Sequence, residues 1–116
     1  MTPFGQRLRD LREQHDRALK DMARALKVSS AYLSALEHGH RAQPKPGFVQ
    51  QVAAYFNLAW EEVDELKALA ELSDPKPSID TRGLSPLATE VANRLRKKIK
   101  LLDESTLRAI LKQLGK

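Results

Sequence analysis

The chain has 116 residues, a net charge of +5 and a pI near 9.7, with 41% hydrophobic and 30% charged residues. This length suits one compact domain, or a small domain with an appendage, and is too short for most multi-step enzymes. The absence of cysteine excludes disulfides and thiolate chemistry. Because no stretch resembles a secretion signal or a bilayer-spanning run of about 20 apolar residues, we expect a cytoplasmic protein with no membrane contact.

The charges are segregated along the chain. Residues 1–45 hold nine Lys/Arg and five Asp/Glu. Residues 46–72 hold one Lys/Arg and five Asp/Glu, and residues 73–116 hold ten Lys/Arg and five Asp/Glu. The order is therefore basic, acidic, basic, and the basic segments favour a polyanionic partner.

Three short helices are predicted first. Apolar residues at spacings of three and four predict a helix over about residues 4–15 and another over about 19–26. Ser29 is a suitable N-cap for a third helix, which Gly39 ends. Because only two residues separate the second and third helices, the spacing predicts a helix-turn-helix.

Two further helices complete the first part of the chain. Pro46 can serve as the first residue of a fourth helix. A fifth is predicted over about residues 60–72, where Glu61 and Glu62 lie in the first turn and suit the helix dipole. No segment of residues 1–72 has the alternation of a strand.

The last part of the chain predicts a linker and a helical hairpin. Pro, Ser, Asp and Gly are concentrated in the segment that follows the fifth helix. Ser85 then caps a long helix that continues to about Leu102, and Asp103 caps a final one. We therefore divide the chain into a helix-turn-helix domain (1–72), a linker (73–84) and a C-terminal helical hairpin (85–116).

Two stretches have a family resemblance. The first closely resembles the Cro and phage-repressor type of helix-turn-helix, the XRE family, and reads LRDLREQHDRALKDMARALKVSSAYLSALEHG. The second resembles that family's fourth and fifth helices and reads PKPGFVQQVAAYFNLAWEEV. The similarity covers about residues 4–72. It implies an all-α, five-helix domain that binds double-stranded DNA in a sequence-specific manner.

The resemblance also implies which residues contact DNA. In this family the third helix enters the major groove and the second crosses the backbone. The base-facing residues would be Ser30, Ala31, Ser34 and Ala35, which also share one helix face. Phosphate contacts are expected from Lys20, Ser29, Tyr32, His40 and Arg41.

A structural ion pair between Arg12 and Glu37 is implied as well. Some positions depart from the family pattern: Lys27 replaces a turn glycine, so the turn needs either a left-handed lysine or a rearranged backbone, and Leu19 replaces a glutamine that bridges to phosphate. Ala18 and Ala59 stand where capping serines are common.

Nothing in the sequence favours metal, cofactor or catalytic chemistry. His38 and His40 flank Gly39 but lack a third ligand at convincing spacing, and His15 adds little. No nucleophile has a partnered base, and no glycine-rich phosphate loop is present. We therefore expect no metal, no cofactor and no enzyme activity.

The predicted hairpin has an apolar stripe that two helices cannot bury alone. It must pack on the first domain, on a second copy or on another protein, and we favour a second copy. The expected dimerisation residues are Val91, Leu95, Ile99, Leu102, Leu107, Ile110, Leu111 and Leu114.

The basic run Arg94, Arg96, Lys97, Lys98 and Lys100 has three interpretations. It is a solvated helix face, a phosphate contact beyond the main site, or a docking surface for an acidic protein.

These observations favour a transcriptional regulator, in particular a repressor that binds an inverted-repeat operator as a homodimer. One alternative is an antitoxin that represses its own operon and captures a toxin through the hairpin. Another is a protein-interaction adaptor that no longer recognises DNA, and activation through the acidic fifth helix is a further alternative.

Overall fold

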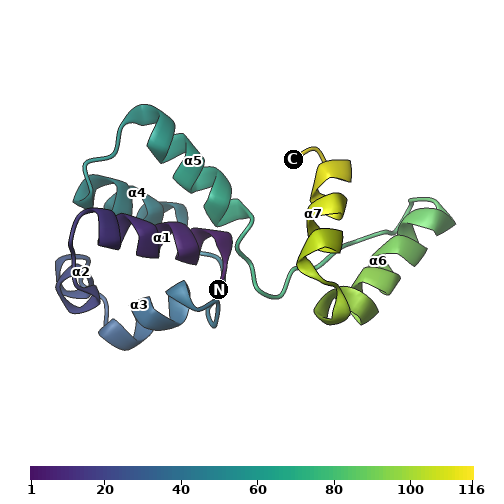
Figure 1. The fold of residues 1–116 in the computed structure, drawn as a ribbon, viewed down its shortest axis with the longest axis horizontal. Coiled ribbons are helices and arrows are strands. Elements are labelled where there is room, and N and C mark those ends of the chain that lie inside the picture. Colours follow the sequence, from purple (N-terminus) through teal and green to yellow (C-terminus); the bar gives the residue numbers. More distant parts are fainter. The chain divides into compact units, whose positions relative to one another are not determined.

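The computed structural model describes residues 1–116 and is entirely helical, as predicted (Figure 1). The chain forms two compact units, Met1–Pro77 and Ser78–Lys116. The first contains α1 (Pro3–Gln14), α2 (Leu19–Ala25), α3 (Ser30–Glu37), α4 (Pro46–Tyr55) and α5 (Trp60–Glu71). The second contains α6 (Pro86–Lys98), the 3-10 helix η1 (Ile99–Leu101) and α7 (Glu104–Gln113). No helix is long and apolar enough to span a membrane.

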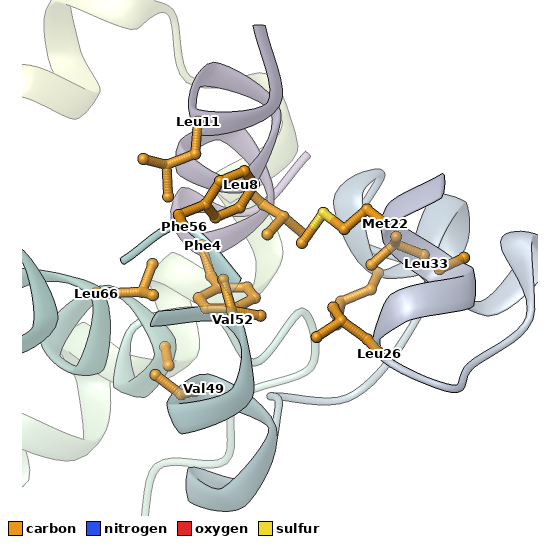
Figure 2. Close-up of a cluster of buried hydrophobic side chains, with 13 residues drawn as sticks. Phe4, Leu8, Leu11, Met22, Leu26, Leu33, Val49, Val52, Phe56 and Leu66 are labelled. Carbon is orange, nitrogen blue, oxygen red and sulfur yellow. The ribbon is translucent and has the colours of Figure 1, made fainter. Parts of the chain in front are cut away.

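The core of the first unit lies where α1 packs against α3 and α5. From α1, the side chains of Phe4, Leu8 and Leu11 are completely buried (Figure 2). The other helices add apolar side chains to the same cluster, including Met22, Leu33, Val52 and Leu66. Burial of each large side chain contributes about 1.5–3 kcal/mol, so this shared core holds all five helices in one unit.

Local capping signals set the predicted helix starts. The Tyr32 N–H donates to Ser29 Oγ at 3.0 Å, and the Thr106 N–H donates to Asp103 Oδ1 at 2.8 Å. Ala18 offers no such acceptor before α2. At the start of α5, the side chain of Glu62 reaches back to the residue before the helix, and its Oε1 accepts the Ala59 N–H at 3.3 Å.

Five of the helices end in the same way. After α1, α2, α3, α4 and α7, a residue with positive φ is followed by a backbone N–H that donates to the carbonyl five positions earlier, which is the Schellman motif. The left-handed residues are Asp16, Lys27, Gly39, Asn57 and Gly115. Of the two conformations expected for Lys27, it adopts the left-handed one, at φ 58°.

The end of the first unit lies later than the sequence indicated. Ser73, which the linker was predicted to include, is only 3% exposed. The Phe4 N–H donates to Ser73 Oγ at 2.8 Å, and the Ser73 hydroxyl donates to the Leu69 carbonyl oxygen. Ser73 therefore joins the end of α5 to the start of α1 and belongs to the first unit.

In the second unit, the prediction of one helix to Leu102 was wrong in its last turn. The α-helix ends at Lys98 and tightens into η1, and Leu102 is extended at φ −78° and ψ 136°. Because Asp103 must leave helical geometry to cap α7, the preceding turn cannot continue as an α-helix. No side chain of α6 or α7 is fully buried.

Candidate nucleic-acid interface

Helices α2 and α3 are joined by a tight turn and pack against each other. The inner face of α3 is fixed by Leu33 and Leu36, which are 0% and 2% exposed. The opposite face contains the four predicted base-facing residues. Ser30 and Ala31 are exposed, whereas Ser34 and Ala35 are half-buried.

This face of α3 has small side chains only. A serine hydroxyl can donate to or accept from several base edges, and an alanine methyl can contact the methyl group of thymine. Neither makes the bidentate hydrogen bonds by which Arg, Asn or Gln distinguish one base. The chemistry of the face therefore favours close approach of the helix to DNA and modest selectivity for each base.

Beside this face, an aromatic pair positions a cation. The ring of Tyr32 meets that of Phe48 edge-on, with 6.1 Å between centroids, and the guanidinium carbon of Arg41 lies 5.5 Å from the Tyr32 centroid. Tyr32 is half-buried against the core, so its ring provides a fixed surface for the exposed Arg41. The cation expected to contact phosphate thus has a preferred position in the free protein.

The remaining predicted phosphate contacts are exposed. Lys20 lies on α2 and His40 follows α3. Ser29 is also exposed, and its Oγ accepts the Tyr32 N–H as the cap of α3. Because a hydroxyl that accepts one hydrogen bond can still donate, Ser29 can cap the helix and donate to a phosphate at once.

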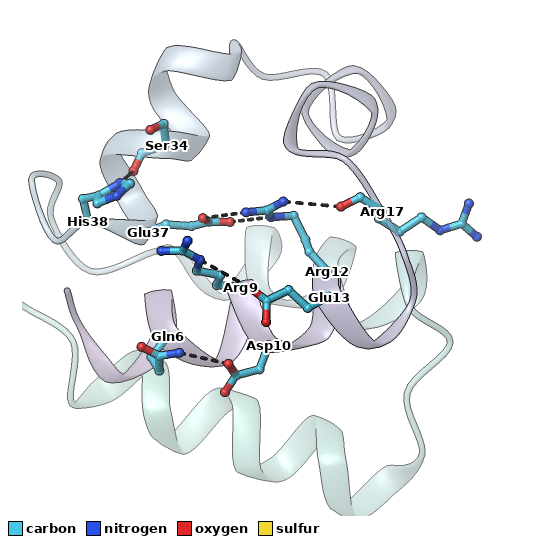
Figure 3. A network of polar contacts seen from close by, with 9 residues as sticks. All are labelled: Gln6, Arg9, Asp10, Arg12, Glu13, Arg17, Ser34, Glu37 and His38. Carbon is cyan, nitrogen blue, oxygen red and sulfur yellow. Dashed lines mark hydrogen bonds and ion pairs between the residues drawn. The ribbon is translucent and has the colours of Figure 1, made fainter.

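The structure brings Arg12 and Glu37 together in a forked ion pair (Figure 3). Arg12 Nε donates to Glu37 Oε2 at 2.8 Å, and Nη2 donates to Oε1 at 3.0 Å. The hydrogen bond to Glu37 raises the pKa of Arg12, which remains charged. Because α1 supplies the arginine and α3 the glutamate, the pair fixes the position of α3 on the scaffold.

Gly5 also positions α3, and sequence reasoning did not identify it. A Cβ added to Gly5 would overlap the carbonyl oxygen of Glu37 and lie 2.8 Å from its carbonyl carbon. The α1 backbone therefore passes directly against the last residue of α3. A glycine inside an amphipathic helix was the available signal, because it often marks a close approach.

The histidines at the end of α3 do not gather other metal ligands. His38 Nδ1 donates to the Ser34 carbonyl oxygen at 2.8 Å. No group of three or more His, Cys, Asp or Glu side chains is placed to hold a metal ion.

The residues predicted for dimerisation remain accessible in the second unit. Leu95, Leu102, Leu107 and Ile110 are half-buried, and Val91, Ile99, Leu111 and Leu114 are exposed. The most exposed of them is Leu114, at 76%.

The two short helices around a tight turn, packed on three further helices, define a helix-turn-helix domain. In agreement, residues 3–66 match the family model described as "Helix-turn-helix domain", which covers more than half of the chain. The chain therefore belongs to the helix-turn-helix family of DNA-binding transcriptional regulators.

Two relatives come from Bacillus subtilis (strain 168). The chain is 36% identical over 63 residues to the uncharacterised HTH-type transcriptional regulator RghRB, covering 54% of this chain and 45% of RghRB. It is 30% identical over 104 residues to the HTH-type transcriptional repressor RghR, covering 78% of this chain and 77% of RghR. The chain thus spans less than half of the first relative but most of the second. No solved structure matches it.

Proposed function

We propose that this protein is a transcriptional repressor that binds an inverted-repeat operator as a homodimer, with α3 in the major groove. The observation that supports α3 as the base-reading helix is its outer face of Ser30, Ala31, Ser34 and Ala35, opposite the buried Leu33. Small side chains let the helix backbone approach the base edges closely. The proposal of repression draws on the similarity to RghR, which is named a repressor.

Sequence preference would come from several weak contributions. The Ser/Ala face discriminates modestly at each base pair, and two half-sites in a dimer add their free energies. Arg41, held over Tyr32, would fix the register of α3 through the DNA backbone. Sequence-dependent DNA shape would supply further preference at base pairs that no side chain touches.

The dimer would form through the second unit. Residues 78–116 bury no side chain completely, and a segment of about 40 residues seldom forms a sufficient core alone. A second copy would cover the apolar residues of α6 and α7, including Val91 and Leu114, in an isologous interface. Two-fold protein symmetry would then match a two-fold operator.

Selection of binding sites from random duplexes with the purified chain tests the proposal. We expect enrichment of an inverted repeat whose half-sites are centred about one helical turn, or a multiple of it, apart. Enrichment of a single half-site would contradict the dimer. Recovery of unenriched sequence would contradict operator recognition and favour a protein-interaction adaptor.

Sedimentation equilibrium tests the dimer directly. We expect Val91→Asp to weaken self-association at least tenfold, because the exposed Val91 would place a carboxylate in the apolar interface. Ala68→Asp adds the same charge at an exposed position of α5 and should leave self-association unchanged. A wild-type chain that is monomeric alone but copurifies with a stoichiometric partner would contradict the homodimer and support toxin capture.

A further inference from the structure

The two units differ sharply in net charge. Residues 1–77 hold 11 Lys/Arg and 11 Asp/Glu, whereas residues 78–116 hold nine and four. The unit that contains the helix-turn-helix is therefore neutral overall, and the second unit accounts for the whole net charge of +5. A protein that binds duplex DNA gains most of its nonspecific affinity from cations that neutralise phosphates.

The acidic side chains of the second unit are already engaged. Asp80 pairs with Arg82, Glu90 with Arg94, and Glu104 with Arg108, each at 2.7 Å. Asp103 accepts the Thr106 N–H as the cap of α7.

Within the second unit, four of the six cations without a carboxylate partner lie on one short segment. Arg96, Lys97, Lys98 and Lys100 lie at the end of α6 and in η1, and all four are exposed. None of them forms an ion pair within 4.0 Å. Cations in the last turn of a helix also suit its dipole, but that effect falls off within one turn and does not account for a run of this density.

The position of the cations on α6 leaves most of the proposed dimer interface free. On α6, Lys97 and Lys98 line an open hollow together with Glu90, Asn93 and Arg94. Lys97, two positions after the half-buried Leu95, lies on the side of the helix away from it, whereas Lys98, three positions after Leu95, lies at the edge of the apolar face. The apolar face of α6 can therefore pack on a second copy while Lys97 contacts an anionic surface and Lys98 lies at the boundary between the two.

The start of the connecting segment lies near the end of α3. In the first unit, Leu72, Ser73, Asp74 and Pro75 line one pocket with His38 and Gly39. The chain thus leaves the first unit beside the loop that contains Arg41. Ser73 closes the end of α5 and the second unit begins at Ser78, and an extended chain of five residues reaches about 17 Å.

We infer that the cations Arg96, Lys97, Lys98 and Lys100 form a second DNA contact, which binds phosphates of the same duplex outside the major-groove site. This inference rests on the proposed function, because it requires a chain bound to DNA through α3. In this arrangement the second unit adds phosphate neutralisation to that of the exposed Lys20 and Arg41 in the first unit. The contact is independent of base sequence, so it adds equally to operator and nonoperator binding.

The dependence of DNA affinity on salt tests the inference. We would titrate the full chain with a fluorescent 30-base-pair duplex of random sequence, and with the selected operator, between about 50 and 300 mM NaCl. Each neutralised phosphate contributes about 0.9 to the slope of log affinity against log salt. We expect K97Q/K98Q/K100Q to reduce that slope by about 2 to 3 per protomer on both duplexes.

Two matched variants separate this role from a general effect of charge. K67Q/K76Q/K116Q removes the same charge from exposed lysines outside the run and should leave the slope within about one of the wild-type value. K97R/K98R/K100R preserves the charge of the run and should retain the wild-type slope. Because Gln and Arg are both good helix formers, α6 should remain folded, which circular dichroism would check.

The outcomes distinguish this inference from the proposed function. If the wild-type chain binds DNA and the lysine-to-glutamine variant has an unchanged slope, the second contact is wrong and the proposed function stands. An equal reduction of the salt slope in K97Q/K98Q/K100Q and in K67Q/K76Q/K116Q would also overturn the second contact, because it would show an effect of net charge alone. If the wild-type chain binds no duplex at low salt, the proposed function itself fails.

Discussion

Arg12 donates from Nε and Nη2 to both carboxylate oxygens of Glu37, a residue 25 positions further along the chain. Glu37 is only 2% exposed, and the Arg12 side chain retains 16% exposure. The third nitrogen, Nη1, donates to the Arg17 carbonyl oxygen at 3.3 Å. One guanidinium therefore joins α1, the turn that follows it and the end of α3.

Removal of this guanidinium should be strongly destabilising. In Arg12→Ala the Glu37 carboxylate stays buried without its partner, and we expect a loss of about 2–3 kcal/mol in the free energy of unfolding. Urea denaturation followed by circular dichroism measures the change. As a control, Arg9→Ala removes a largely exposed ion pair to Glu13 and should cost less than about 0.5 kcal/mol. Similar values for the two variants would show that the buried pair has no special role.

Substitution by alanine should change the stability of the protein in opposite directions at Gly5 and at Gly47. At Gly5 the new methyl group would collide with the Glu37 backbone, so we expect Gly5→Ala to lower stability by more than about 2 kcal/mol. At Gly47, in the first turn of α4, no atom lies within 4 Å of an added Cβ. Gly47→Ala should therefore stabilise the protein by about 0.4–1 kcal/mol, through reduced entropy of the unfolded chain. Thermal unfolding of both variants checks the contrast, and a stabilised Gly5→Ala would refute the close approach.

Lys27 offers a stabilising substitution. Its φ of 58° places a long side chain in the left-handed region, which costs a non-glycine residue about 1–2 kcal/mol. We expect Lys27→Gly to raise the free energy of unfolding by about 0.5–1 kcal/mol. Asn57 has a similar φ of 52°, but asparagine tolerates this region better, so Asn57→Gly should gain less. A loss of stability in Lys27→Gly would show that the lysine side chain makes a compensating contact.

Ala35→Glu tests the position of α3 on DNA. Ala35 is half-buried on the outer face of α3, so a glutamate there can extend to solvent in the free protein but would meet base edges and phosphates in the complex. We expect operator affinity to fall at least about 100-fold, with little change in thermal unfolding. Ala68→Glu makes the same change on α5 and should leave affinity nearly unaltered. Retained binding by Ala35→Glu would place another surface in the groove.

The sequence predicted those features that depend on neighbours along the chain. Ser29 and Asp103 start their helices as expected, because a cap needs only an acceptor and an N–H three positions later. Gly39 ends α3 for a similarly local reason. The face of α3 followed from helical periodicity, and the family resemblance suggested its function.

Features that depend on distant partners were missed. Ser73 was assigned to a linker by composition, although its hydroxyl accepts a hydrogen bond from Phe4, 69 positions away. The approach of Gly5 to Glu37 likewise depends on how two helices cross. Such contacts are set by how distant segments pack together, which local sequence patterns do not reveal.

The hydrogen bond from Phe4 to Ser73 also determines where the DNA-binding unit can be cut. A fragment that stops at the end of α5, residue 71, would leave the Phe4 N–H without its acceptor in a buried site. Because Thr2 caps the start of α1 and Ser73 closes the end of α5, the shortest self-sufficient fragment runs from Thr2 to Ser73. The two termini of that fragment lie side by side. A short loop could therefore link Ser73 to Thr2, and new termini could be placed in another loop, so that a circular permutant would keep the same core.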